Sequence, residues 1–324
     1  MNVRNQLAGV ALLLACATLS TSSTRAADKI LVRHAINTIT AVNWPDFVAE
    51  TKGFNDRRNI NVQQFVVPAE SIVAAVIAGS VDVGLANATQ LVLSVDKGAN
   101  IAAVGIGGAN QPYHLMASPS VKAFADLKGK TLALADSVDI YDDVLRQIFK
   151  KHGLDMDKDL NVIYGNGSTQ RYAAIASGAI QAGLFPPPLD ADLASRGFTS
   201  LAYTPDYYPH LPISVNAVNR GWAAANADTL RRFLQARSDA IDWLNNPANQ
   251  DEAIQILMDQ TKVSKPAAQV AYDYYIKQKQ FPHDGCIQTL GLDTLVHMLK
   301  ETGRLAKLGA NDAGKLIDRQ WCPK

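Results

Sequence analysis

A twelve-residue phrase occurs twice in this chain, as AAVIAGSVDVGL at residues 74–85 and as AAIASGAIQAGL at residues 173–184. Five of the twelve positions are identical, and most of the others exchange one small or apolar residue for another. Each copy has the pattern of a helix end, a glycine turn, a short buried strand and a Gly-Leu exit into a loop. Two similar α/β units predict two lobes that face each other across a cleft, where small ligands commonly bind.

Length and charge fit that prediction and exclude some partners. The 324 residues suffice for two domains with separate cores. Apolar residues make up 48% and charged residues 19%, as is typical of globular proteins. Because the formal net charge is only +1, neither nucleic acid nor an anionic membrane surface is expected as a partner.

The first 26 residues have the pattern of a secretory signal peptide. Arg4 precedes an uncharged run over residues 7–15, and Thr24-Arg25-Ala26 places small residues before a cut after Ala26. The run has nine residues, whereas a bilayer span needs about 20. The expected location is therefore the periplasm. The alternative is a lipid anchor, because Leu13-Leu14-Ala15-Cys16 is close to a lipobox that would acylate Cys16.

Cysteine usage agrees with export under either alternative. Once Cys16 is removed or acylated, only Cys286 and Cys322 remain, and two cysteines in an oxidising compartment predict a disulfide. Closing a loop of about 35 residues would stabilise the fold by roughly 3–4 kcal/mol in the chain-entropy model. Neither cysteine has the spacing of a metal ligand, so no metal site and no cofactor are expected.

Strand and helix patterns alternate along the chain. Strands are predicted at residues 29–35, 61–67, 81–85 and 101–106, with helices between them, which indicates a mostly parallel sheet. A second set follows at residues 131–135, 161–164 and the second repeat. Extended segments at 113–118 and 213–218 are expected to cross between the lobes, and helices are predicted over 222–246, 249–260 and 264–279. The predicted first lobe comprises residues 27–116 and 216–324, and residues 117–215 form the second.

This order resembles the type II periplasmic substrate-binding proteins of ABC transporters, in the group that binds sulfonates, taurine, nitrate or thiamine-pyrimidine precursors. Four stretches that span most of the mature chain carry the resemblance: residues 49–54 (AETKGF), 78–84 (AGSVDVG), 126–131 (DLKGKT) and 177–183 (SGAIQAG). Two segments depart from the family pattern. The loop before the first helix is Thr38-Ile39-Thr40-Ala41-Val42-Asn43-Trp44, and Phe185-Pro186-Pro187-Pro188 replaces a glutamate-proline pair.

The resemblance implies a two-lobe α/β fold and a monomeric receptor that closes on a small organic molecule, a sulfonate, a carboxylate or a pyrimidine-like compound. Its partners would be that ligand and an ABC permease with its ATPase. A periplasmic ligand-sensing module is the first alternative. A secreted enzyme of the pyrimidine-precursor synthase fold is the second. No nucleophile, metal or nucleotide motif such as HExxH, GxSxG or Walker A occurs in the sequence, so an enzyme is not expected.

Candidate ligand-binding residues follow from the rule that ligands bind outside the carboxyl ends of parallel strands. Trp44 and Phe185 could each wall the cleft or pack in the core. Asn87 is expected to cap a helix and could contact ligand from the same helix end. Arg171 is expected to be solvated. The full set is Asn37, Asn43, Trp44, Asn87, Ala88, Thr89, Asp136, Ser137, Asp139, Asn166, Phe185 and Pro186.

Overall fold

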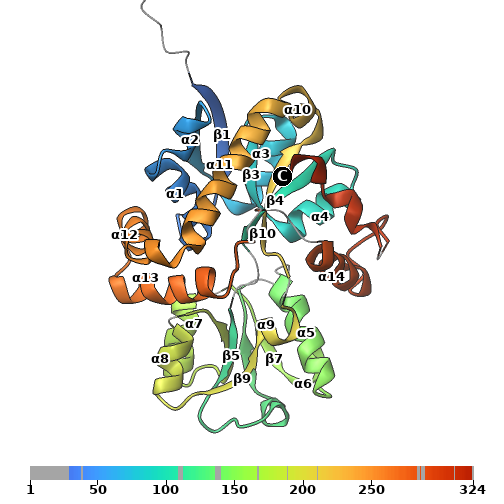
Figure 1. Ribbon diagram of the computed structural model, residues 1–324. Helices are drawn as coiled ribbons and strands as arrows, with labels where there is room; N and C mark the ends of the chain where they lie inside the picture. Colours follow the sequence, from blue (N-terminus) through green and yellow to red (C-terminus); the bar gives the residue numbers. More distant parts are fainter. Residues whose placement is uncertain are drawn as a thin grey trace, which may run out of the picture.

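The chain folds into two lobes, each built on a five-stranded sheet flanked by helices (Figure 1). The computed structural model describes residues 29–322 except 38, 109–111, 136–139, 166–167, 188, 210, 283–284, 286–288 and 310. The predicted signal peptide and Cys16 therefore lie outside the described residues. Within the described part, no helix is both long enough and apolar enough to cross a membrane.

The first sheet has the strand order β2-β1-β3-β10-β4. β1 pairs in parallel with β2 and β3, whereas β10 is antiparallel to both of its neighbours. The strands are β2 (Ile60–Val66), β1 (Ile30–Ile36), β3 (Val83–Asn87), β10 (Ser214–Asn219) and β4 (Ile101–Gly108).

The second sheet repeats this arrangement in the order β7-β6-β8-β5-β9, with β5 as its antiparallel strand. Its strands are β7 (Asn161–Ile163), β6 (Thr131–Ala133), β8 (Ala182–Phe185), β5 (His114–Ala117) and β9 (Thr199–Tyr203). The predicted two-lobe α/β fold with mostly parallel sheets is confirmed. The expected lobe division between residues 116 and 117 falls inside β5, a strand of the second sheet.

Helices cover both sheets. The first lobe carries η1 (Ala41–Asn43), α1 (Trp44–Thr51), α2 (Phe54–Arg57), α3 (Ala69–Ala78), α4 (Ala88–Asp96), α10 (Arg220–Ala225), α11 (Ala227–Asn245), η3 (Pro247–Asn249), α12 (Gln250–Thr261), α13 (Lys265–Tyr272), the π-helix η4 (Asp273–Lys277), α14 (Thr289–Glu301), η5 (Asp312–Leu316) and η6 (Arg319–Trp321). The second carries η2 (Phe124–Leu127), α5 (Ile140–Lys151), α6 (Met156–Asp159), α7 (Ser168–Ala176), α8 (Leu189–Ser195) and α9 (Thr204–Tyr207). α13 lies at the edge of the first lobe that faces the second (Figure 1).

The two copies of the repeated phrase occupy equivalent positions. Each ends a helix (α3 or α7) with a left-handed glycine, Gly79 at φ 70° and Gly178 at φ 82°, which favours a residue without a side chain. The following strand, β3 or β8, lies next to the antiparallel strand of its sheet. The phrase therefore encodes one supersecondary unit that is used once in each lobe.

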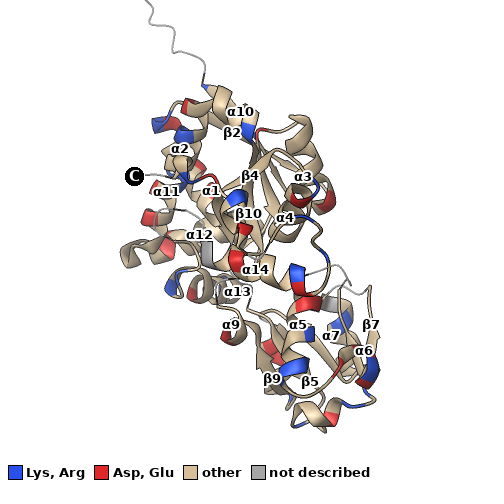
Figure 2. Cartoon of the chain, turned by 90° about the vertical axis from the view of Figure 1, so that its right-hand side faces the viewer, with Lys and Arg blue, Asp and Glu red and all other residues tan. Residues whose placement is uncertain are grey.

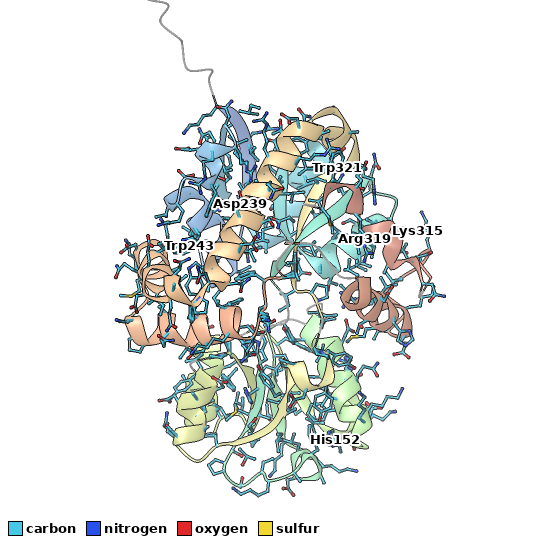
Figure 3. All side chains as sticks on the ribbon, viewed as in Figure 1. His152, Asp239, Trp243, Lys315, Arg319 and Trp321 are labelled. Atoms are coloured by element: carbon cyan, nitrogen blue, oxygen red, sulfur yellow. The ribbon has the colours of Figure 1, made fainter. Side chains whose placement is uncertain are left out.

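The C-terminal segment packs on the first lobe. Trp321 is buried in the same apolar cluster as Val104, Leu230 and Phe233, and Figure 3 shows Trp321, Arg319 and Lys315 along this segment, with His152 far away in the second lobe. Arg220 donates a hydrogen bond to the Lys315 carbonyl oxygen at 2.7 Å and forms an ion pair with Asp318. Cys286 lies outside the described residues, so its disulfide with Cys322 stays a prediction.

Helix α3 packs closely against β3, which explains why the repeat has a glycine at position 84. The same packing predicts that adding a side chain there lowers stability. A Cβ at Gly84 would lie 2.6 Å from Ile72 Cγ2 and 2.7 Å from Val76 Cγ2, and both side chains are buried. We expect Gly84→Ala to lower the free energy of unfolding by about 1–3 kcal/mol through overpacking, measured by urea denaturation. Gly314→Ala is the control, because nothing lies within 4 Å of its Cβ position. Equal effects of the two substitutions would contradict this packing account.

A buried histidine in β1 predicts acid sensitivity of the first lobe. His34 is fully buried against Phe233, and burial lowers its pKa from 6.5 to about 4, although Asp46 opposes the shift. The neutral ring is favoured in the folded state, so protons bind preferentially to the unfolded chain between these values. Stability should fall by roughly 3 kcal/mol as the pH drops from 6.5 to 4. In urea titrations between pH 6.5 and 4, His34→Leu should lose less unfolding free energy than the unsubstituted protein. The control His297→Gln, at an exposed position, should lose as much as the unsubstituted protein. An unchanged pH dependence in His34→Leu would refute the assignment.

Candidate functional site

The carboxyl ends of the two repeat strands meet at the crossings between the lobes. Asn87, the last residue of β3, pairs with Ser214, the first residue after the chain returns to the first lobe. Phe185, the last residue of β8, pairs with His114, the first strand residue after the chain enters the second lobe. Because β10 and β5 both begin at the crossings, the two repeats present their strand ends toward the same interlobe region.

The first lobe contributes a pocket of about 190 Å³ at these strand ends. It is lined by two of the four predicted asparagines, Asn37 and Asn87, and by seven further residues, Thr40, Val42, Ala69, Ile72, Leu85, Ile213 and Ser214. The lining therefore combines apolar side chains with amide and hydroxyl groups. This is the composition expected of a small-molecule site in which a few polar groups fix orientation.

Asn87 also begins helix α4. Its side-chain Oδ1 accepts hydrogen bonds from the backbone N–H groups of Thr89 at 2.9 Å and Gln90 at 3.3 Å, so the predicted N-cap is confirmed. The carboxamide oxygen is used by the cap, whereas its NH₂ group has no hydrogen-bond partner among the described residues. Asn87 thus combines a structural oxygen with an amide donor in a residue that lines the pocket.

A second pocket, of about 290 Å³, lies between the lobes. It shares Thr40 and Val42 with the first pocket, so the two are adjacent. Its lining is drawn from η1, the entry crossing, the loop after β8, α13 and η4, and comprises Thr40, Ala41, Val42, Pro112, Tyr113, Pro186, Pro187, Ala267, Val270, Ala271, Tyr274 and Tyr275. None of these lining residues is charged.

The second lobe adds a small hollow next to Tyr113, lined also by Tyr141, Asp142 and Arg171. Arg171 is 3% exposed and donates hydrogen bonds to Ser168 Oγ and to the Leu184 carbonyl oxygen, both at 3.2 Å. The expectation that Arg171 is solvated is wrong, because the first turn of α7 lies against the end of β8. A positive charge therefore lies inside the second lobe, beside its strand ends.

The predicted site residues separate into three groups. Asn37, Asn87 and Pro186 line the two adjacent pockets. Five others, Asn43, Trp44, Ala88, Thr89 and Phe185, are buried. Asp136, Ser137, Asp139 and Asn166 lie outside the described residues, so their ligand contacts stay predictions.

For the two aromatic candidates the structure favours the packing alternative. Trp44 is fully buried, donates from Nε1 to the Ala253 carbonyl oxygen at 3.1 Å and packs edge-on against Tyr272. Phe185 is also fully buried, in a cluster with Met116 and Ile175. Both side chains are committed to the core because the strand end or helix start that carries them is covered by a further helix layer. We therefore do not retain either as a ligand contact.

Several lining residues of the larger pocket that the sequence did not single out come from α13 and η4. Val270, Tyr274 and Tyr275 follow the first sheet by many residues in the chain, and their pattern is that of an ordinary amphipathic helix. Only the tertiary placement of α13 against the second lobe brings them to the pocket. Among the described residues, no three His, Cys, Asp or Glu side chains gather as a metal site.

Acidic residues at the start of α5 are neutralised by arginines rather than exposed to the cleft. Asp142 binds Arg146 Nε at 2.6 Å and accepts from the Tyr164 hydroxyl at 2.7 Å. Asp143 forms a 2.5 Å ion pair with Arg304, which follows α14. The next residues, 306–308, donate backbone N–H groups to Asp96 of α4. The Asp143–Arg304 pair therefore links the second lobe to the first.

Elsewhere the surface charge is mixed. Lys and Arg residues are interspersed with Asp and Glu residues on both lobes, and neither lobe shows a face of one sign in the view of Figure 2. The Asp143–Arg304 pair at the lobe boundary is thus a specific contact and does not belong to a face of one sign in this view.

Comparison with known proteins agrees with this architecture. A family model described as NMT1/THI5 like matches residues 41–252, more than half of the chain. No curated protein matches the chain.

Solved structures of low sequence identity share the fold. The periplasmic aliphatic sulphonate binding protein SsuA from Escherichia coli is 18% identical, with a TM-score of 0.68 over 89% of this chain and 97% of that chain. SsuA from Xanthomonas axonopodis pv. citri, bound to MOPS, is 16% identical, with a TM-score of 0.64 over 90% and 98%. The periplasmic nitrate-binding protein NrtA from Synechocystis is 14% identical, with a TM-score of 0.67 over 91% and 87%.

The ion pair between the lobes predicts a measurable effect on their closure. Burial raises the pKa of Asp143, and Arg304 opposes that shift. Arg304→Leu should leave the Asp143 carboxylate buried without its arginine and weaken the contact between the two lobes by about 3–5 kcal/mol. Small-angle scattering should show a larger radius of gyration for Arg304→Leu than for the unsubstituted protein. The double variant Asp143→Leu/Arg304→Leu should recover much of the compaction. An unchanged radius in Arg304→Leu would show that the pair does not hold the lobes together.

Proposed function

The chain belongs to the NMT1/THI5-like family, and from that premise we propose that it is the extracytoplasmic solute-binding protein of an ABC importer. It captures a small organic molecule by closure of its lobes and delivers it to a membrane permease. The main support is the register that directs both repeat strands toward one interlobe region, where two adjacent pockets lie. Two hinged lobes around such a region are the arrangement that ligand-induced domain closure requires.

We propose that the ligand is a sulfonate, a carboxylate or a pyrimidine-like molecule. Arg171 provides positive charge in the second lobe, and Asn87 provides an amide donor in the first. The names of the structural relatives include sulfonate-binding and nitrate-binding proteins, which supports an anionic group. Among the predicted contacts, Asp136, Ser137, Asp139 and Asn166 remain part of this proposal, since their segments follow strands of the second lobe.

We propose further that the bound molecule is released unchanged. The described pockets contain amide, hydroxyl and guanidinium groups that can orient a ligand, and the sequence supplies no recognised catalytic motif. The predicted signal over residues 1–26 would take the chain to the periplasm, where it would meet a membrane permease whose ATPase completes the importer. In that compartment Cys286 and Cys322 would form their disulfide.

Native mass spectrometry of the freshly purified full chain tests the proposal directly. We expect a retained small molecule whose mass is unchanged after release and rebinding, and small-angle scattering should show compaction when it rebinds. Conversion of that molecule into a product would instead support an enzyme. Complete absence of a retained or rebinding molecule from cell extract would contradict a solute-binding role.

Asn87 allows its capping and binding roles to be separated. Asn87→Asp keeps an oxygen for the α4 cap, so stability should change little. It removes the amide donor from the pocket, so affinity for the molecule released from the unsubstituted protein should fall roughly tenfold by calorimetry. Asn87→Ala should lose a comparable amount of affinity and also about 1 kcal/mol of stability. Full affinity in Asn87→Asp would remove this residue from the proposed site.

A further inference from the structure

The helix that forms one wall of the interlobe pocket changes its winding there. α13 runs to Tyr272 in α-helical form, and residues Asp273–Lys277 continue as the π-helix η4. A π-helix is rare, and short π-helical segments occur frequently at functional sites. Here the wider turn carries two consecutive tyrosines, Tyr274 and Tyr275, and both line the pocket.

Core and pocket residues lie next to each other around the start of the π-helical turn. Tyr272, just before it, is buried in the apolar cluster of the first lobe and packs on Trp44. Tyr274 and Tyr275 line the pocket together with Pro186 and Pro187 of the second lobe, and Tyr275 also packs against that apolar cluster. The π-helical turn therefore carries aromatic side chains of the first lobe at the surface that faces the second.

The pocket rings are held by neighbouring rings. Tyr275 stacks on Phe281 with centroids 5.4 Å apart, and Tyr274 meets Tyr275 edge to face at 5.0 Å. Across the pocket, Tyr113 meets Tyr141 edge to face at 4.6 Å. Such braced rings present fixed aromatic surfaces, and prolines 112, 186 and 187 add flat apolar ones.

The Tyr274 hydroxyl is an unusual buried polar group in a residue that lines this pocket. The side chain is 95% buried, and its hydroxyl has no hydrogen-bond partner among the described residues. A buried polar group without a partner costs stability. Burial and the nearby phenols Tyr275 and Tyr203 raise the pKa of Tyr274 above its usual range, so the hydroxyl stays protonated and remains a donor.

We infer that the pocket between the lobes binds the aromatic ring of the ligand, with Tyr275 and Tyr113 contacting the ring and the Tyr274 hydroxyl hydrogen-bonding to a polar substituent. This inference rests on the proposed solute-binding function and specifies its ligand class as an aromatic or heteroaromatic compound. The uncharged lining places the ring, and not the ionic group, in this pocket. Any ionic group would lie toward Asn87 or Arg171, in the adjoining hollows.

The size of the pocket agrees with a small ring system. An engineered protein cavity of about 150 Å³ accommodates benzene, and this pocket measures about 290 Å³. A substituted single ring or a fused pair of rings therefore fits, whereas nitrate alone would leave most of the pocket unfilled.

Two matched pairs of probes test the inference. Benzenesulfonate is compared with cyclohexanesulfonate, and benzoate with cyclohexanecarboxylate, by calorimetry on the full chain. Each pair has the same charge and a similar ring size, but only one member has an aromatic face. We expect the aromatic member to bind at least tenfold more tightly in at least one pair. Tyr275→Leu, which keeps apolar volume, should bring that ratio close to one.

Tyr274→Phe separates binding from folding, because it removes only the hydroxyl. We expect the melting temperature of the ligand-free variant to be equal or higher, since a buried group without a partner is removed. Affinity for the tighter aromatic probe should fall roughly tenfold. Tyr272→Phe is the matched control on the same helix and should leave the affinity unchanged. A lower melting temperature with unchanged affinity in Tyr274→Phe would show a purely structural role and overturn the assignment.

The outcomes distinguish failure of the inference from failure of the proposed function. Equal binding of aromatic and saturated probes overturns the aromatic assignment while the chain still acts as a solute-binding protein. Retention of a non-aromatic molecule in native mass spectrometry does the same. If none of the four probes binds and no retained molecule is found, the solute-binding function itself is overturned.

Discussion

The pairing of each antiparallel strand with a repeat strand is the constraint on which the rest of the structure depends. β10 lies between β3 and β4, and β5 lies between β8 and β9. Each of these two strands begins where the chain has just crossed from the other lobe. The ladder hydrogen bonds therefore fix the crossings at the carboxyl ends of the repeats, and the pockets lie there as a consequence. A one-residue slip of either strand would turn its buried face outward, so the position of the site and the stability of the sheets have the same origin.

The two sides of the interlobe region differ in their chemistry. Ionic groups near it are largely satisfied by other protein groups, as in the pairs of Asp142 with Arg146 and Asp143 with Arg304. The lining of the larger pocket is instead neutral, with tyrosines and prolines opposed across the lobes. Closure of the lobes could therefore bury this surface without leaving a charged group unpaired. An unpaired charge in a region of low dielectric would cost free energy. If the proposed aromatic ligand binds here, specificity would depend on a small number of hydrogen-bonding groups and on ring shape.

Much of this fold was predictable from local pattern. The repeated glycine turn, the βαβαβ order and the return strand near residues 213–218 all appear as expected, because short apolar strands between capped helices leave few alternatives. The short strand β9 and the helices α8 and α14 were not predicted, since their patterns are brief or interrupted. The π-helical winding after Tyr272 could not be predicted either, because residues 264–279 have an ordinary helical pattern.

Site residues were harder to predict than elements. Asn37, Asn87 and Pro186 follow directly from the strand-end rule and do line the pockets. Trp44 and Phe185 satisfy the same rule but are buried, because a strand end gives a position in the chain and not a side-chain direction. Tyr274 and Tyr275 satisfy no local rule, and only the three-dimensional placement of α13 brings them into the pocket.

The position of β10 also affects the order in which the polypeptide can mature during synthesis. All strands of the second sheet lie between residues 114 and 203, so that lobe can assemble as soon as its own segment has emerged. The first sheet must wait for residues 214–219, which fill the gap between β3 and β4. Until then those two strands have unpaired edges, the kind of surface that promotes aggregation. The lobe that is translated first is thus completed last, and its unfinished edges need protection until residues 214–219 are in place.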